Sequence, residues 1–383
     1  MPLDLTKLNK EQKEAVLHNK GPLLIVAGAG TGKTTVITQR IVHLIEKKLA
    51  LPEEILAVTF TEKAATEMEE RVDKLLEIGY VDLWVSTFHS FCERVLRENA
   101  LDIGLPGDFK ILENTSGWLL ARQNLDKFDL NYYKALGNPT KFIQALISHF
   151  SHCKDQEVYP ENYLKYADDL KTTDNGPEVQ ETERIKEVAG AYHTYQKILL
   201  DNSALDFGDL INYCLKLFKK RPLILKKYQK KFKYILVDEF QDTNWSQYEL
   251  IKLLAAPANN LTVCADDDQA IYRWRGASFS NIVQFSEDFP KAKKISLIKN
   301  YRSCQNILDQ SYAFIKQNDP DRLEFISKIN KKLVANTKEK GIIEHIHEKT
   351  LDGEVGSVLK KILEILKKDK PARKGFTTGD AGG

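Results

Sequence analysis

The sequence predicts an α/β protein whose parallel sheet is interrupted by an all-helical insertion, and three observations support this fold class. Short apolar segments alternate with segments of helical periodicity before residue 100 and again after residue 233. A glycine-rich loop joins the first apolar segment to the first long helical segment. From Leu119 to Leu200 the periodicity is helical, without convincing strand patterns. Strands that alternate with helices are typical of parallel pairing, so one helix-covered sheet is expected.

Before the insertion, short apolar runs predict strands, and apolar side chains spaced three and four residues apart predict helices. Leu23 to Ala27 is an uninterrupted apolar run that stops at glycines, and Lys33 to Lys47 repeats apolar side chains with helical spacing. The expected strands are 23–27, 55–60 and 83–87, and the expected helices are 33–47, 63–76 and 88–98.

After the insertion the same alternation resumes. The expected strands are 234–237, 261–265 and 294–297, with a helix at 246–254. Beyond Asn300 we predict a helix at 305–316, a strand at 341–347 and a helix at 354–368. The last residues, 375–383, are rich in glycine and predict a disordered tail.

Composition limits the class of protein without identifying a partner. The chain has 383 residues, enough for two or three domains, and a formal charge of only +2, so any basic track for a nucleic acid must be local. No apolar run approaches the roughly 18 residues that a membrane span needs, and the N-terminus lacks a secretory pattern. The five cysteines are scattered without a CxxC pair, which disfavours disulfides and zinc and favours a reducing cytoplasm.

The glycine-rich loop predicts a phosphate-binding site. Glycines let several backbone N–H groups point at one anion, and the following helix adds the positive end of its dipole. Lys33 is expected to reach the outer phosphates and the Thr34 hydroxyl to bind Mg²⁺. The alternative is a glycine-rich turn without a ligand, and the strand before the loop and the helix after it count against that. The loop residues are Ala27, Gly28, Ala29, Gly30, Thr31, Gly32, Lys33 and Thr34.

A pair of carboxylates supplies the expected second half of this site. The apolar run Tyr234 to Val237 leads directly into Asp238 and Glu239. In the same sheet as a phosphate loop, Asp238 is expected to hold Mg²⁺ and Glu239 to orient and deprotonate the attacking water. The alternative is an ordinary pair of surface carboxylates at a strand end.

With their neighbours, these residues resemble the superfamily 1 DNA helicases of the UvrD, Rep and PcrA type. The resemblance runs in register from Leu8 to about Arg302, and more weakly to about Leu363. It implies a RecA-like P-loop domain at 1–110 and 201–290, a helical subdomain at 111–200 and an incomplete second RecA-like domain at 291–383. The segments that carry the resemblance besides the phosphate loop are 8–12, 59–65, 86–90, 207–210, 238–242, 266–276 and 300–303.

For the nucleotide, the resemblance implies ATP and Mg²⁺ as cofactors. It implies that Gln12 reads the adenine edge, that Tyr301 stacks on the adenine and that Gln269 senses the terminal phosphate. Arg302 would stabilise charge on the transferring phosphate, with a buried salt bridge as the alternative. Thr35 stands where members of the family often have an arginine near the base, and we expect it beside the nucleotide.

For DNA, the resemblance implies movement along single strands in the 3′ to 5′ direction and binding at duplex junctions. Phe60 and Trp274 offer flat faces for base stacking, with core packing as the alternative. Thr87 and His89 would contact the DNA backbone, although a lone histidine is more often structural. Thr61 and Tyr272 lie in the same family motifs. Repair or replication proteins are implied as partners.

Two later motifs of the family's second motor domain are not found after Ser303. The arginines that follow, Arg322 and Arg373, stand in unrelated surroundings. We therefore expect an N-terminal fragment of a helicase that binds nucleotide, hydrolyses it slowly and unwinds DNA poorly. Two other hypotheses remain open, namely a nucleotide-gated DNA-binding module without turnover and a helicase–nuclease subunit of the RecB or AddA type.

Overall fold

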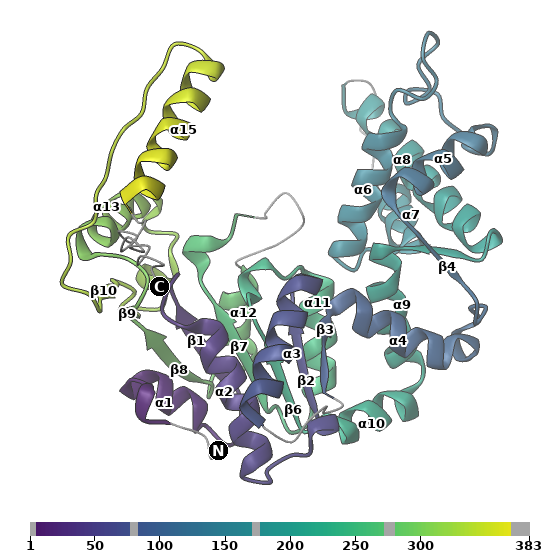
Figure 1. The fold of residues 1–383 in the computed structure, drawn as a ribbon. Coiled ribbons are helices and arrows are strands. Elements are labelled where there is room, and N and C mark those ends of the chain that lie inside the picture. The colour runs from purple at the N-terminus through teal and green to yellow at the C-terminus, as the bar shows by residue number, and fades with distance from the viewer. Residues whose placement is uncertain (1–4, 77–82, 171–176, 272–279, 369–383) are drawn as a thin grey trace, which may run out of the picture.

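A six-stranded parallel sheet forms the centre of the molecule (Figure 1). The computed structural model describes residues 5–76, 83–170, 177–271 and 280–368. The strand order is β3-β2-β6-β7-β1-β8, and every pair of neighbours in the sheet is parallel. The strands are β1 (Leu23–Ala27), β2 (Ile55–Thr59), β3 (Trp84–Thr87), β6 (Tyr234–Val237), β7 (Leu261–Ala265) and β8 (Lys293–Leu297). The parallel sheet that the sequence predicts is confirmed.

Helices cover both faces of this sheet because its strands bury their side chains on both sides. Successive residues of β1 alternate between two apolar clusters, with Leu23 and Ile25 in one and Leu24 and Val26 in the other. The first cluster includes residues of α1 (Lys10–Val16), α2 (Lys33–Glu46) and α3 (Glu62–Leu76). The second includes residues of α4 (Phe88–Asn99), α9 (Phe207–Lys220), α10 (Pro222–Lys231), α11 (Trp245–Ala255) and α12 (Ser280–Asp288). Since α2, after β1, and α12, after β7, pack on opposite faces, the carboxyl ends of β1 and β7 mark the point where the strand order reverses, and such points favour ligand binding.

The helical insertion has an apolar core of its own and lies at one end of the molecule (Figure 1). Phe150 and Tyr192 stack within this core with their ring centroids 5.0 Å apart. A short parallel pair of strands, β4 (Lys110–Leu112) and β5 (Ala204–Asp206), joins the chain where it leaves for the insertion and where it returns. The helices are α5 (Asn114–Gln123), α6 (Ile143–Asp155), α7 (Pro160–Asp169) and α8 (Pro177–Asp201).

A buried lysine fixes the insertion to the sheet domain. Lys154, near the end of α6, is 2% exposed, and its Nζ lies 2.6 Å from Asp206 Oδ2 and 2.9 Å from Asp209 Oδ1. Its carbonyl oxygen accepts hydrogen bonds from Asn212 Nδ2 at 2.9 Å and from Ser246 Oγ at 2.6 Å. Because these partners belong to or adjoin α9 and α11, one residue ties α6 to two helices of the sheet domain.

The chain after Asn300 folds beside the carboxyl end of β1. Strands β9 (Lys299–Asn300) and β10 (Val334–Ala335) pair in parallel, and the helices are α13 (Gln305–Ile315), α14 (Leu323–Ile326) and α15 (Leu351–Lys368). Figure 1 shows α15 at the opposite end of the molecule from the insertion. None of the helices within the described ranges is long and apolar enough to cross a bilayer.

The strand predicted at 341–347 is wrong, because the structure has irregular chain there. Ile342 and Ile343 are 83% and 60% exposed, so the apolar residues that suggested the strand are not covered by a neighbouring element. A strand needs a hydrogen-bonding neighbour, which an apolar pattern alone does not supply. The predicted tail at 375–383 lies outside the described residues. The domain boundaries at 110, 200 and 290 stay predictions. Strand β8 lies beyond the boundary at 290, yet it pairs with β1 in the central sheet.

Replacing Lys154 by methionine is expected to destabilise the protein by about 3 kcal/mol, because Asp206 and Asp209 would lose their buried cation. The matched control is Lys165→Met at an exposed position of α7, which should change stability by less than about 0.5 kcal/mol. Urea unfolding of the three proteins measures the difference. Equal stability of Lys154→Met and the unmodified protein would contradict a structural role for this ion pair.

Candidate active site

The phosphate loop and the two predicted carboxylates meet at the carboxyl edge of the sheet. Lys33 and Thr34 begin α2 directly after the loop, whereas Asp238 and Glu239 follow β6, two strands away from β1. Lys33 Nζ lies 2.6 Å from Glu239 Oε2. The Thr34 hydroxyl lies 3.3 Å from Asp238 Oδ2. Residues about 200 positions apart in the chain therefore share one site.

Burial gives these charged groups unusual electrostatics. Asp238 is 5% exposed. Its burial, together with the neighbouring Glu239, raises the pKa of Asp238 to about 6. Burial opposes the charge on Lys33, but pairing with Glu239 still holds the pKa of Lys33 above its usual value. Glu239 itself adopts a left-handed backbone conformation with φ of 50°, which is uncommon for a residue with a side chain and recurs at functional sites.

The residues present suit a magnesium ion that arrives with phosphate ligands. The described residues contain no group of three or more His, Cys, Asp or Glu side chains able to hold a metal ion by themselves. Mg²⁺ typically takes only one or two protein carboxylates and completes its shell with water and substrate phosphates. The Asp238 carboxylate and the Thr34 hydroxyl, 3.3 Å apart, are the hard oxygen donors such an ion needs.

Two glycines let the phosphate loop pass close to other segments. Gly30 has φ of 74°, and a Cβ there would lie 2.7 Å from Arg302 Cβ and 2.8 Å from Asn300 Nδ2. Gly32 has φ of 88°, and a Cβ there would lie 2.9 Å from Gln12 Nε2. Positive φ disfavours a larger residue at both positions, and at Gly30 the nearby Arg302 Cβ leaves no space for one.

The chain at 300–302 is bonded to the phosphate loop. Asn300 Nδ2 donates to Ala29 O at 2.7 Å, and the Tyr301 N–H donates to Gly30 O at 2.8 Å. Within the loop, the Thr31 hydroxyl donates to Gly28 O at 2.7 Å. Arg302 follows this contact and is exposed. Its predicted role at the transferring phosphate stays a prediction, but the buried salt bridge considered for it is wrong.

Gln12 and Tyr301, both predicted to hold the base, lie beside the phosphate loop and are linked through Asn9. Gln12 Nε2 donates to Thr31 O at 2.9 Å, and Gln12 Oε1 accepts from the Asn9 N–H at 3.1 Å. Asn9 Nδ2 in turn donates to the Tyr301 hydroxyl at 3.2 Å. The Tyr301 side chain is 46% exposed, so a ring face is accessible. Thr35 is exposed at the start of α2.

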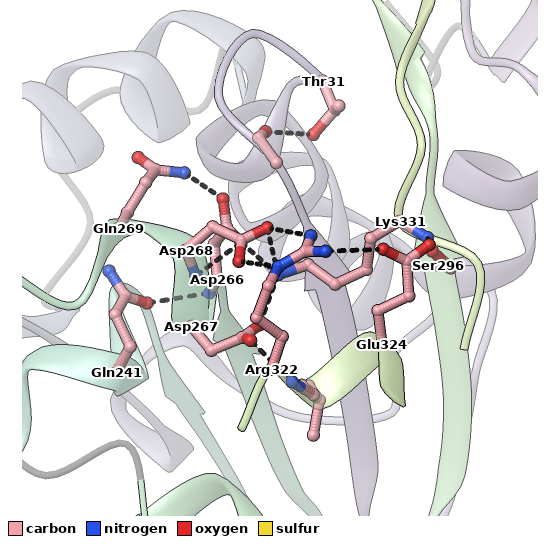
Figure 2. Close-up of polar contacts among 12 residues, drawn as sticks. Thr31, Gln241, Asp266, Asp267, Asp268, Gln269, Ser296, Arg322, Glu324 and Lys331 are labelled. Atoms are coloured by element: carbon pink, nitrogen blue, oxygen red, sulfur yellow. Dashed lines mark hydrogen bonds and ion pairs between the residues drawn. The ribbon is translucent and has the colours of Figure 1, made fainter. Parts of the chain in front are cut away.

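Gln241 connects Glu239 to the end of β7, the strand between β6 and β1. Its Nε2 donates to Glu239 Oε2 at 2.7 Å, and its Oε1 accepts from the Asp266 N–H at 3.0 Å. Gln269 lies three residues after Asp266, and its Nε2 donates to Asp266 Oδ2 (Figure 2). The predicted sensor of the terminal phosphate thus shares a hydrogen-bonded network with Glu239.

A separate cavity of about 230 Å³ brings together residues predicted to bind DNA. Phe60, Thr87 and His89 line it, together with Phe207, whose side chain is 45% exposed. The rings of His89 and Phe207 meet edge to face with their centroids 5.5 Å apart. Two carboxylates, Glu62 and Glu93, also line the cavity. Aromatic faces beside carboxylates suit a nucleobase better than a phosphate.

Two of the residues predicted to contact DNA, Thr87 and Thr61, also accept hydrogen bonds from backbone N–H groups near the starts of helices. The Thr87 hydroxyl accepts from the Ser90 N–H at 3.2 Å and so caps α4, and it donates to Glu62 Oε1 at 2.8 Å. The Thr61 hydroxyl accepts from the Ala64 N–H at 3.1 Å near the start of α3. Burial lowers the pKa of His89, which favours a neutral ring. Tyr272 and Trp274 lie outside the described residues.

Sequence reasoning did not assign roles to two residues that the structure places in these sites. Gln241 was seen only as part of a motif, and no local signal shows that it joins Glu239 to Asp266. Phe207 was also seen only as part of a motif. Its position directly after the helix cap Asp206 is no signal of exposure, because Phe88 directly follows the helix cap Thr87 and is buried.

Comparisons with known proteins show a similarity to DNA helicases. The family model described as UvrD/REP helicase N-terminal domain matches residues 8–290. The chain is 44% identical over 311 residues to the ATP-dependent DNA helicase PcrA of Staphylococcus epidermidis, covering 81% of this chain and 40% of that protein. It is 43% identical over 315 residues to PcrA of Bacillus subtilis, covering 82% of this chain and 40% of that protein. The chain thus matches about 40% of the length of these relatives.

Gly30→Ala is expected to weaken binding of Mg²⁺·ADP about tenfold, because the new Cβ would push Asn300 and Arg302 away from the phosphate loop. Gly21→Ala is the matched control, since Gly21 also has positive φ (84°) but nothing lies within 4 Å of its Cβ position. Titration with a fluorescent ADP analogue measures both. Equal affinities of the two variants would show that the close contact with 300–302 is unimportant for the nucleotide.

Proposed function

Because the chain belongs to the UvrD/Rep helicase family, we propose that it is the N-terminal motor part of an ATP-dependent DNA helicase that binds Mg²⁺·ATP and single-stranded DNA. The observation that carries this proposal is the convergence of Lys33 and Thr34 with Asp238 and Glu239 at one edge of the sheet. A phosphate loop beside a buried aspartate and a partly exposed glutamate provides the groups that phosphoryl transfer to water requires.

Each of these four residues has a task in the proposed reaction. Asp238 and Thr34 would hold Mg²⁺, which when bound neutralises charge on the phosphate oxygens. Lys33 is paired with Glu239 at 2.6 Å, so an incoming phosphate competes with Glu239 for the ammonium group. Release from Lys33 leaves the Glu239 carboxylate available as a base toward water. Gln269 would respond to the terminal phosphate, and Arg302 would approach the transferring phosphate from the chain after β9.

The nucleotide base and the DNA would occupy separate places. Tyr301 is proposed to stack on the adenine, with Gln12 and Thr35 beside it. Phe60, His89 and Phe207 are proposed to hold a DNA base in the 230 Å³ cavity, with Thr61 and Thr87 next to the strand. Tyr272 and Trp274 are proposed as further DNA contacts on the strength of the family resemblance.

The wider activity follows from the family and forms part of the proposal. Translocation from 3′ to 5′, duplex-junction DNA as a substrate, and repair or replication proteins as partners come from the resemblance and not from particular side chains here. The PcrA relatives favour the helicase over the nuclease-subunit alternative. All five cysteines are unpaired, which fits the reducing cytoplasm that we propose as the location.

Glu239→Gln is expected to lower ATP turnover at least about 100-fold while leaving the affinity for Mg²⁺·ATP within a few-fold, because only the proton acceptor is lost. The control is Glu53→Gln at an exposed position, which should leave both quantities unchanged. Single-turnover hydrolysis of radiolabelled ATP, with and without oligo(dT), detects slow reactions. Unchanged hydrolysis in Glu239→Gln would rule out this enzymatic assignment.

Phe207→Ala is expected to weaken binding of single-stranded DNA about tenfold, since stacking of one base on an aromatic ring contributes about 1–3 kcal/mol. Phe314→Ala is the matched control, because Phe314 is 71% exposed but lies on α13, away from the cavity. Fluorescence anisotropy of a labelled oligo(dT) gives the affinities. If both variants bind as tightly as the unmodified protein, Phe207 is not a stacking platform.

A further inference from the structure

The ammonium group of Lys331 is enclosed by the carboxylates of three consecutive residues, which lie next to the candidate nucleotide site. We call Asp266, Asp267 and Asp268, which follow β7, the acidic turn. The side chain of Lys331 is 3% exposed, and its Nζ lies 2.8 Å from Asp266 Oδ1 and 2.8 Å from Asp268 Oδ2. It also pairs with Asp267 Oδ1 (Figure 2). Burial opposes its charge, but the three carboxylates together hold the pKa of Lys331 above its usual value.

Two residues that precede Lys331 in the chain, Arg322 and Leu323, also bind the acidic turn. Arg322 donates two hydrogen bonds of 2.8 Å to Asp268, from Nε to Oδ1 and from Nη2 to Oδ2. The Leu323 N–H donates to Asp267 Oδ2 at 2.7 Å, and the Leu323 side chain is fully buried in the core of the sheet domain. The segment from Arg322 to Lys331 therefore clamps the acidic turn from one side.

On its other side, the acidic turn contacts two glutamines, Gln241 and Gln269, near the predicted site of the terminal phosphate. The Asp266 N–H donates to Gln241 at 3.0 Å, and Gln241 donates to Glu239 at 2.7 Å. The Asp266 carboxylate also accepts from Gln269. Asp266 thus contacts Lys331 and both carboxamides, and only Gln241 separates it from the catalytic carboxylate.

An ion cluster of this kind contributes more to geometry than to stability. Desolvation of buried charges offsets much of their attraction, so an apolar side chain of similar size could stabilise the fold as well. Hydrogen-bonded charges fix the direction of their partners, and outer partners of functional groups commonly tune those groups. The positions fixed here are those of Glu239 and Gln269.

We propose that Lys331 is a positioning residue for the γ-phosphate end of the nucleotide site, acting through Asp266 on Gln241, Gln269 and Glu239. The inference rests on the proposed function, since it assigns a partner to the ATP site. Because Lys331 and Arg322 come from the chain after β9, the placement of that segment sets how well the site distinguishes ATP from ADP. By thermodynamic linkage, binding of a triphosphate in turn strengthens the contact between the acidic turn and that segment.

The test compares triphosphate with diphosphate binding, which does not depend on turnover. A bound fluorescent ADP analogue is displaced from the full chain by Mg²⁺·ATPγS and by Mg²⁺·ADP, and the ratio of the two dissociation constants is the readout. The unmodified protein should prefer ATPγS. Lys331→Met should reduce that preference about tenfold, a usual effect of losing an outer partner, with ADP affinity nearly unchanged. Lys331→Arg should restore most of the preference.

Two further variants separate positioning from folding. Lys332→Met, at the exposed neighbouring position, should leave the ratio unchanged. Lys331→Met combined with Asp267→Asn removes one charge of each sign, so it should fold even if the single variant does not, and it should still lose the preference. Thermal unfolding is recorded for each protein.

The outcomes distinguish the inference from the proposed function. If the unmodified protein binds neither nucleotide, both the proposed function and the inference are wrong. If it binds both nucleotides equally, or if the ratio is unchanged in Lys331→Met and in the double variant, only the inference fails. A lower melting temperature with an unchanged ratio would show that Lys331 is merely structural.

Discussion

The candidate site depends most on the meeting of Lys33 with Glu239 at the carboxyl edge of the sheet. This contact of 2.6 Å joins the loop after β1 to the end of β6. It places the Lys33 ammonium group and the Glu239 carboxylate where an incoming phosphate can displace one from the other. It exists because β7 alone separates β1 from β6 in a parallel sheet, so both strands end at the same edge. The rest of the fold keeps these two strand ends in register.

The sequence predicts the sheet and its edge well, for physical reasons. Fully buried parallel strands appear as short apolar runs, and the predicted runs at 23–27, 234–237 and 261–265 coincide with β1, β6 and β7. The predicted helix at 246–254 coincides with α11, which begins where the Asn244 side chain accepts a hydrogen bond from the Gln247 N–H. Local chemistry determines such features, so a local pattern reveals them.

Contacts between distant segments could not be predicted in the same way. Lys331 resembles its exposed neighbour Lys332 in sequence, yet it lies buried among carboxylates 63–65 positions earlier in the chain. Gln241 similarly acquires its role only because β7 lies beside β6. The strand expected at 341–347 is wrong for the converse reason, since no strand within the described part of the chain pairs with its apolar residues. Pairing across the fold decides each of these cases.

We propose above all that one Mg²⁺–nucleotide binds between Lys33 and the two carboxylates. The most direct measurement is the crystal structure of the chain with Mn²⁺ and ATPγS, using the anomalous signal of manganese. We expect one strong peak beside the Thr34 hydroxyl and the Asp238 carboxylate, with Lys33 turned from Glu239 to the phosphates. A nucleotide bound elsewhere, or a peak remote from Asp238, would contradict the account.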